Sequence, residues 1–319
     1  ERSRGLGDVY KRQLYYTGQN QQGDIVYEDE NLLSELDLFP SVNLIYSLRE
    51  MSNLRFSLSR TIARPSFKEK SIAQIFDPVT STTFIGNIDI LPTKILNYDL
   101  RWELFQENAQ MYAISLFYKD FKNPIELVVY NGASPNDYTP KNVDEAKVYG
   151  IELEFRKNLE FINESLSNFK LTFNTSIIRS EEIMDEKEYE GRTKSARSGE
   201  VVSRKRELQG QSPYLINIGL NYNSINNNFE GSLNYNVQGK TLQIVGVNYV
   251  PDIFTEPFNS LNLNFNYKFG RTDNLKLGLG IKNLLDEKIE SFYYTNDIKS
   301  IYSSLSPRRE FKLSLGINF

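Results

Sequence analysis

The sequence predicts an all-β protein, an antiparallel transmembrane β-barrel with about eleven strands present. Three observations predict this fold. Apolar and polar residues alternate with period two through most of the 319 residues. The links between the predicted strands alternate between short and long. Aromatic residues are frequent, with 20 Tyr and 20 Phe, and no run of about 18 apolar residues offers a membrane-spanning helix.

Composition excludes several classes of function. The chain has no Cys and no His, so disulfides, zinc or haem sites of the usual ligand types, Cys nucleophiles and Ser-His-Asp triads are all excluded. We therefore expect no catalytic residues, no metal, no cofactor and no enzymatic activity. A net charge of -4 argues against nucleic-acid binding. The basic run Arg204 to Arg206 is interpreted as solvated loop charge.

The first 40 residues show no clear element. Residues 1–13 are expected to be an artefact or a disordered leader, because 4–13 resemble a peptide translated from sequencing-adapter DNA. A flexible natural N-terminus is the alternative. Residues 14–40 are expected to form a loop or partial strand, and residues 41–319 the C-terminal portion of an outer-membrane barrel.

From residue 41 onward the alternation defines the strands. The apolar faces lie, in order, within residues 42–48, 54–58, 96–104, 112–118, 149–155, 169–177, 214–222, 229–237, 261–269, 275–281 and 311–319. One apolar and one polar face fits either a soluble sandwich or a membrane barrel. Strands of about 11 residues, tilted by about 45°, would span the roughly 25 Å apolar band of a barrel.

The connections favour the membrane barrel. Short links are expected at residues 50–52, 106–109, 160–166, 224–227 and 270–274. Long links are expected at residues 65–93, 122–145, 180–211, 239–257 and 286–307. Short turns at one end and long polar loops at the other are typical of outer-membrane barrels. Since the last strand should end on the periplasmic side, the long loops are the extracellular, ligand-facing ones. Aromatic residues near strand ends suit the girdles at the two membrane interfaces.

Charged residues on the polar strand faces are interpreted as lumen lining. Glu152 and Glu154 lie on one strand face with Arg156, and an acid/base pair is the less favoured alternative, because an aqueous or protein-filled lumen requires such residues. The same interpretation applies to Asp99, Arg101 and Glu103. The loop acids Asp137, Asp144, Asp185 and Asp252 lack the spacing of a calcium loop and are expected to be solvated.

The last strand carries an assembly signal. Its apolar positions are Phe311, Leu313, Leu315, Ile317 and the terminal Phe319. An alternating strand with an aromatic end resembles the signal that the bacterial barrel-assembly machinery recognises. An ordinary edge strand is the alternative.

Four stretches resemble the C-terminal barrel of TonB-dependent outer-membrane receptors, especially those of Bacteroidetes-type bacteria. They are Ser-Arg-Thr-Ile-Ala-Arg-Pro-Ser-Phe at 59–67, Gly-Asn-Ile-Asp-Ile-Leu-Pro at 86–92, Tyr-Gly-Ile-Glu-Leu-Glu at 149–154 and Lys-Asn-Leu-Leu-Asp at 282–286. Ile88 stands where the family usually has proline. Pro65 explains physically why the first of these strands ends in a loop.

The resemblance implies a function and its partners. Such receptors hold a plug inside a barrel of 22 strands and import a siderophore, glycan or peptide with energy delivered by TonB. It implies an outer-membrane location and four partners: outer-membrane lipid, TonB through an N-terminal plug region outside this sequence, the barrel-assembly machinery and a small extracellular ligand. The alternative is a passive porin or a surface adhesin. Against 22 strands, the eleven predicted here would be roughly half of a larger barrel. Half a barrel would leave two open edges whose backbone groups are unpaired, which is unfavourable in lipid.

Ligand contacts are expected in the long loops, because the strand faces are committed to lipid and lumen. The candidates are aromatic residues that could stack on a sugar or an aromatic siderophore, or could belong to the upper girdle. They are Tyr130, Tyr138, Phe254, Phe292, Tyr293 and Tyr294.

Overall fold

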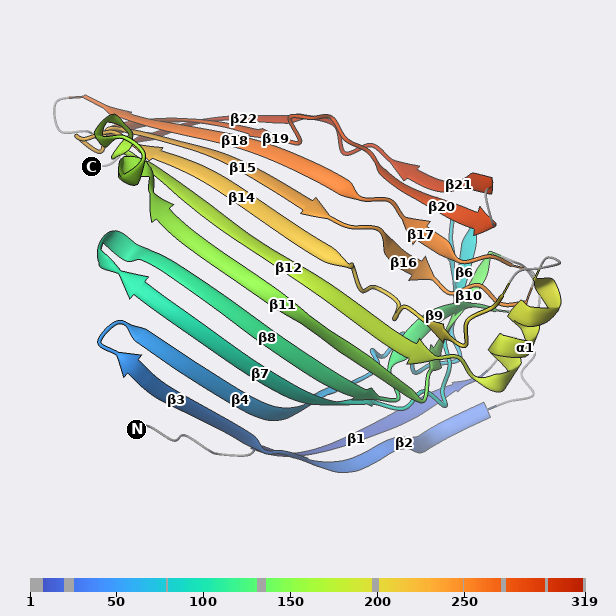
Figure 1. The fold of residues 1–319 in the computed structure, drawn as a ribbon. Helices are drawn as coiled ribbons and strands as arrows, with labels where there is room; N and C mark the ends of the chain where they lie inside the picture. Colours follow the sequence, from blue (N-terminus) through green and yellow to red (C-terminus); the bar gives the residue numbers. More distant parts are fainter. Residues whose placement is uncertain are drawn as a thin grey trace.

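The fold is dominated by one large antiparallel sheet (Figure 1). The computed structural model describes residues 8–19, 26–78, 80–130, 136–196, 201–248, 250–270, 274–295 and 298–317. Eleven strands follow one another in chain order from one edge of the sheet to the other. They are β3 (Ser41–Arg49), β4 (Ser52–Ala63), β7 (Thr93–Gln106), β8 (Gln110–Lys122), β11 (Glu145–Asn158), β12 (Phe169–Ile183), β14 (Tyr214–Asn223), β15 (Phe229–Gln238), β18 (Phe258–Phe269), β19 (Leu275–Lys282) and β22 (Glu310–Ile317). The eleven strands predicted from the alternation are confirmed.

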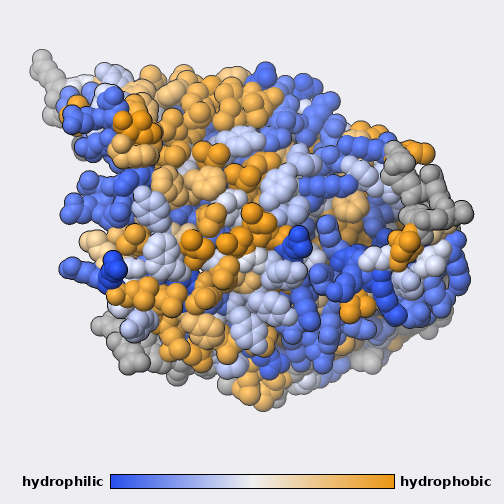
Figure 2. Space-filling view, viewed as in Figure 1, coloured by the Kyte–Doolittle hydropathy of each residue, from blue (hydrophilic) through white to orange (hydrophobic). Residues whose placement is uncertain are grey.

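One face of this sheet is apolar and exposed. Leu100, Leu116 and Ile177 are 41%, 50% and 57% exposed, and apolar residues gather over the strands in Figure 2, with hydrophilic residues towards both ends. No second sheet covers this face among the described residues, so it is the lipid-facing surface of a barrel wall. Within the described part of the chain, no helix is long and apolar enough to cross a membrane.

The strands are joined by short turns at one end of the sheet, as predicted. The β7–β8 turn contains the 3₁₀ segment η1 (Glu107–Ala109), and the β11–β12 turn contains η2 (Leu159–Phe161) and η3 (Glu164–Leu166). At the β18–β19 turn, Gly270 has φ +100°, a conformation that side chains rarely adopt. Aromatic rings line the lipid-facing side near these turns. The contacts run from Phe169 to Tyr222, then to Phe229 and Phe265, with centroid distances of 4.8, 5.9 and 5.8 Å, as an interfacial girdle requires.

At the opposite end, the long connections are folded and not open loops. They contain β5 (Gln74–Asp77), β6 (Thr82–Ile85), β9 (Ile125–Val129), β10 (Asp137–Asn142), α1 (Glu186–Ser195), β13 (Lys205–Arg206), β16 (Thr241–Ile244), β17 (Ile253–Thr255), β20 (Ile289–Thr295) and β21 (Ile298–Leu305). We call these elements the outer layer. Eight of the strands form two four-stranded sheets, ordered β5-β6-β10-β9 and β16-β17-β20-β21. Figure 1 places the outer layer beyond the ends of the long strands.

The first 40 residues require a correction. Residues 8–13, expected to be an artefact or a disordered leader, begin β1 (Asp8–Gln19). Residues 14–40, expected to form a loop or partial strand, contain the rest of β1 and the whole of β2 (Val26–Phe39), which pairs antiparallel with β1. Only Pro40 separates β2 from β3, and the exposed Leu36 and Leu38 continue the outward phase of β3. The prediction missed this strand because acidic residues interrupt the apolar pattern. The buried Asp37 pairs with Arg64 at 3.5 Å.

Candidate functional site

The outer layer is one continuous unit across its two sheets. The strand β9 joins β16 through a parallel bridge between Val128 and Val245. The backbone N–H of Val129 donates to the carbonyl of Val245 at 3.0 Å, and that of Val245 donates to Leu127 at 3.1 Å. Because these residues come from two connections about 115 positions apart, the layer holds separate segments in one fixed arrangement over the barrel mouth.

Two of the predicted ligand aromatics build the core of this layer. Tyr138 is 5% exposed and clusters with Val129, Ile244 and Ile253, and Tyr293 packs at the edge of the same cluster. The hydroxyls of Tyr138 and Tyr302 lie 2.6 Å apart, and burial raises the pKa of Tyr138. Burial prevents Tyr138 from stacking on a ligand in this conformation. Tyr130, also a predicted candidate, is 39% exposed at the end of β9.

The other three candidates meet in a basic and aromatic cluster. The Lys240 Nζ lies 3.2 Å from the ring centroid of Tyr294 and 4.4 Å from that of Phe254, and the two rings meet edge-on at 5.6 Å. The Lys299 Nζ lies 3.9 Å from the ring centroid of Phe292. Ammonium groups over aromatic faces are attracted by the ring quadrupole. The sequence predicts these three rings only as separate loop candidates and gives no sign of the two lysines that lie over them.

Burial and hydrogen bonds shift the pKa values of Tyr294 and Lys240 in this cluster. Lys299 pairs with Glu256 at 3.3 Å, and the Tyr294 hydroxyl donates to the same carboxylate. Burial and this hydrogen bond raise the pKa of Tyr294 to about 12. Burial also lowers the pKa of Lys240. The cluster therefore presents two amines, one carboxylate and three rings, a set suited to ligands that carry both aromatic or sugar rings and anionic groups.

A rim pocket opens beside this cluster at the top of the barrel wall. Its volume is about 480 Å³, a size that suits a small-molecule site. The pocket is lined by Leu127, Gln209, Gly210, Gln238, Gly239, Thr241, Gln243, Thr255, Glu256, Phe258 and Ile289. Glu256 belongs to both the pocket and the basic and aromatic cluster, so the two features form one continuous surface.

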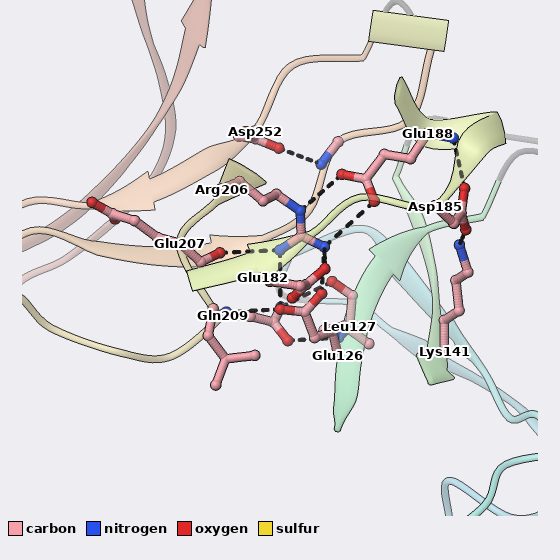
Figure 3. A network of polar contacts seen from close by, with 12 residues as sticks. Glu126, Leu127, Lys141, Glu182, Asp185, Glu188, Arg206, Glu207, Gln209 and Asp252 are labelled. Atoms are coloured by element: carbon pink, nitrogen blue, oxygen red, sulfur yellow. Dashed lines mark hydrogen bonds and ion pairs between the residues drawn. The ribbon is translucent and has the colours of Figure 1, made fainter. Parts of the chain in front are cut away.

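A buried ion network fastens the outer layer to the barrel (Figure 3). Arg206 on β13 lies within 2.6 Å of both Glu126 and Glu182, and within 2.8 Å of Glu188. The exposed fraction of the Arg206 side chain is 8%, and those of the three glutamates are 1%, 0% and 9%. These residues come from β9, β12 and α1, so one guanidinium joins three elements.

Neighbouring pairs extend this network. Arg192 on α1 holds Asp252 in a bidentate pair at 2.8 and 2.9 Å. Asp185 accepts a hydrogen bond from the backbone N–H of Glu188 at 2.7 Å, which caps α1, and it also pairs with Lys141. The interpretation of Asp185, Asp252 and Arg206 as solvated loop charges is wrong, because each has a fixed partner in the folded layer.

In the described part of the chain, no group of three or more acidic residues is arranged to hold a metal ion. The carboxylates of the network instead face guanidinium and ammonium groups. Within the long link predicted at residues 180–211, α1 runs as far as Ser195, and β13 pairs with β12.

The predicted assembly signal occupies the edge strand β22. Phe311, Leu313, Leu315 and Ile317 are 67%, 74%, 68% and 53% exposed on the lipid-facing side. Phe319 lies outside the described residues. A strand with an open hydrogen-bonding edge and a regular apolar face is the form that strand-pairing recognition requires.

We expect deletion of Phe319 to impair assembly and leave ligand contacts unchanged. The terminal ring would complete the alternating face that assembly factors read. The measurement is the amount of heat-modifiable, folded barrel in the outer membrane of cells that produce the full receptor. Phe319→Leu serves as the matched control for loss of aromaticity alone. Unchanged insertion after the deletion would contradict this expectation.

Comparisons with known proteins agree with this architecture. A family model described as TonB dependent receptor-like, beta-barrel, matches residues 9–284. The ferric citrate transporter FecA is similar with TM-score 0.59 and 16% identity, over 89% of this chain and 38% of that one. A mutant ferric enterobactin receptor of Pseudomonas aeruginosa, in complex with enterobactin, is similar with TM-score 0.57 and 19% identity, over 89% of this chain and 41% of that one. The siderophore receptor PirA of Acinetobacter baumannii is similar with TM-score 0.55 and 15% identity, over 89% of this chain and 41% of that one.

The chain thus spans about two fifths of the length of these structures. At such identities the likeness shows the fold. No curated protein sequence matches the chain.

Proposed function

This chain belongs to the TonB-dependent receptor-like β-barrel family, and from this we propose that the whole protein imports an extracellular ligand across the outer membrane with energy delivered through TonB. The apolar outer face of the sheet places the chain in the outer membrane. The observation that carries the proposal is the folded outer layer, which presents a pocket and an adjoining basic and aromatic cluster at the barrel mouth.

The ligand we propose is a siderophore, a glycan or a peptide that carries ring and anionic groups. Lys240 and Lys299 supply positive charge, while Phe254, Phe292 and Tyr294 supply ring faces. The similar structures include a ferric citrate transporter and a receptor in complex with enterobactin.

The proposal also names partners within the receptor. In the described residues, β3 and β22 form the edges of the large sheet. Open edges are unfavourable in lipid, so we propose that further strands of the whole receptor pair with both. A plug that contacts TonB would occupy the lumen, and the barrel-assembly machinery would insert the strands.

Uptake should depend on energy. Cells that produce the full receptor, and lack other receptors for the probes, are offered radiolabelled ferric enterobactin, a sialylated oligosaccharide and an acidic peptide that contains tyrosine. We expect uptake of at least one probe, and loss of that uptake after an uncoupler or deletion of TonB. Uptake that continues without energy would indicate a passive pore, and the absence of uptake of every probe would contradict the proposed ligand classes.

Selectivity should move with the long connections. Segments 65–93, 122–145, 180–211, 239–257 and 286–307 are exchanged as one set for those of a relative with a different ligand, because the buried network couples several of them. We expect uptake to switch to the donor's ligand. A matched exchange of the five short turns should leave selectivity unchanged. If specificity stays with the original strands while the barrel remains folded, the long connections do not determine it.

A further inference from the structure

The lumen-facing side of the sheet carries two chemically different regions, apart from charged residues such as Lys170, Glu230 and Lys268 that share this face nearer the short turns. The first, the charged wall, consists of Arg55, Arg101, Glu103, Glu154 and Arg156 on β4, β7 and β11. The second, the amide strip, consists of Asn174, Asn217, Ser232, Asn234, Asn236, Ser260, Asn262 and Asn264 with Gly219, Gly278 and Gly280, on β12, β14, β15, β18 and β19. Strand register places both regions on one face, because Glu154 lies directly opposite Asn174, and Asn174 opposite Asn217.

The charged wall is an interlocked chain of ion pairs. Arg101 contacts Glu154 at 2.9 Å and Glu103 at 3.2 Å, Arg55 also pairs with Glu103, and Arg156 lies 3.6 Å from Glu154. Moving a polar solute or protein surface across this wall would break charge-assisted contacts, which are the stronger class of hydrogen bond. These pairs agree with the prediction that the charged residues of β7 and β11 line the lumen.

The amide strip has the opposite character. The strand β14 contains no charged residue at all, and the Asn217 amide donates to Asn174 at 2.6 Å. Two of its glycines lie where neighbouring side chains leave no space for another side chain, because a Cβ at Gly219 would lie 2.4 Å from the Thr172 hydroxyl, and one at Gly278 would lie 2.5 Å from that of Ser314. The strip is therefore uncharged and able to hydrogen-bond along its length.

The rim pocket leads directly onto this strip. Gln238 and Phe258 line the pocket and lie directly opposite each other on β15 and β18. Two residues further down the same face, Asn236 faces Ser260, and then Asn234 faces Asn262. No charged side chain stands between the pocket and Asn264 on this face of β15 and β18.

We propose that the amide strip is the wall along which a hydrophilic ligand leaves the rim pocket and enters the barrel, while the charged wall, whose ionic groups pair with one another, stays closed to the ligand. This inference rests on the proposed function. A ligand moving over the strip exchanges hydrogen bonds with water for hydrogen bonds with amides, which has little net cost. Over the charged wall it would desolvate ionic groups at a much larger cost.

Single cysteines can test which side opens, because these 319 residues contain no Cys. Ser232→Cys and Ser260→Cys report on the amide strip, and Ser57→Cys and Ser59→Cys report on the lumen face of β4 beside Arg55. All four serines are half-buried and the substitution is nearly isosteric, so local exposure favours neither side. Any cysteine elsewhere in the full receptor is replaced by serine.

Labelling is measured in energised cells with a neutral maleimide-polyethylene glycol and with N-ethylmaleimide. The labelling rate with the polyethylene glycol reagent is divided by the labelling rate with N-ethylmaleimide. This ratio corrects for thiol reactivity and reports how much space lies beside each position. We expect this ratio to be about tenfold higher on the strip, equivalent to about 1.4 kcal/mol in access. An equal or higher ratio at Ser57 and Ser59 would overturn the proposal. A higher ratio on the strip that an uncoupler leaves unchanged would support the route but contradict energy coupling, which distinguishes the inference from the proposed function. Heat-modifiability confirms that each variant is folded.

Discussion

Replacing Arg206 with methionine should unfold the outer layer locally while the strands of the large sheet remain paired. The substitution would leave Glu126, Glu182 and Glu188 buried without their shared cation. Removing one partner of a buried ion network costs about 3 to 5 kcal/mol, because the remaining charges keep their desolvation penalty. We expect the free energy of opening this layer to fall by that amount.

Proteolysis of native receptor in outer-membrane vesicles measures the effect. Thermolysin should cut the segment 186–211 about a hundredfold faster or more in Arg206→Met, because each 1.4 kcal/mol changes the open population by about tenfold. Arg204→Met is the matched control. It lies in the same basic run and pairs with Glu186 at 2.6 Å, but its side chain is 52% exposed, so we expect an effect below about 1 kcal/mol.

A rescue variant separates charge from packing. Arg206→Met combined with Glu126→Leu and Glu182→Leu replaces most of the network by apolar side chains. Such exchanges are often neutral or stabilising in proteins, so we expect proteolysis to return towards the wild-type rate. If Arg206→Met is cut no faster than Arg204→Met, the network does not fasten the layer.

The strands were predictable because their signal is local. Alternation of side chains across a pleated strand is written into neighbouring residues, and the polar partners on the lumen face follow from the same phase. The same phase predicts that Arg101 and Glu154 both face the lumen, where they lie 2.9 Å apart. The alternation is less clear in β2, where acidic residues lie beside the outward Leu36 and Leu38, and one of these, Asp37, is buried against Arg64.

The outer layer was not predictable in the same way, because its contacts are long-range. Arg206 meets Glu126 from 80 positions away, and nothing in the run Arg204 to Arg206 distinguishes the buried residue from its two exposed neighbours. The alternation of side chains along β12 offers the one usable signal for this network in the sequence. Glu182 continues the lumen face of β12 above Ser180, and its cross-strand neighbour Ala146 is small enough to leave space for a further side chain.

The ligand aromatics illustrate the same limit. Tyr138, Phe254 and Tyr294 all follow strand-like segments in polar surroundings, and composition alone cannot tell a core ring from a surface ring. The bridge between Val128 and Val245 decides the matter, because it brings two sheets together. Tyr138 then faces the shared core, while Tyr294 and Phe254 face Lys240.

The stability of the outer layer should fall as pH rises from neutral towards 9. Glu182 is fully buried. Burial, followed by the charge of Glu126, raises its pKa to about 9, although the charge of Arg206 opposes the shift. The groups that face it from the packed elements are Glu126 on β9, Arg206 on β13 and Glu188 on α1. A neutral Glu182 reduces repulsion among three carboxylates that share one guanidinium.

The sign follows from proton linkage. In the folded state Glu182 keeps its proton up to about pH 9, whereas in the unfolded chain it releases the proton near its ordinary value of 4.5. Between these values the folded state binds more protons, so each unit of rising pH destabilises it, by at most about 1.4 kcal/mol. The contribution is complete below pH 4.5 and lost above about pH 9.

Glu182→Gln should remove this dependence, because an amide mimics the protonated carboxyl at every pH. The rate of thermolysin cleavage at segment 186–211 is measured from pH 6 to 9 and divided by the rate on an unfolded peptide at the same pH. We expect the wild type to open progressively with rising pH and Glu182→Gln to stay level and exceed wild-type stability at pH 9. Glu181→Gln is the matched control, since its side chain is 43% exposed and paired with Lys205 at 2.9 Å, and it should retain the wild-type slope. A level wild-type profile, or a slope that persists in Glu182→Gln, would show that Glu182 does not hold a proton in the folded layer.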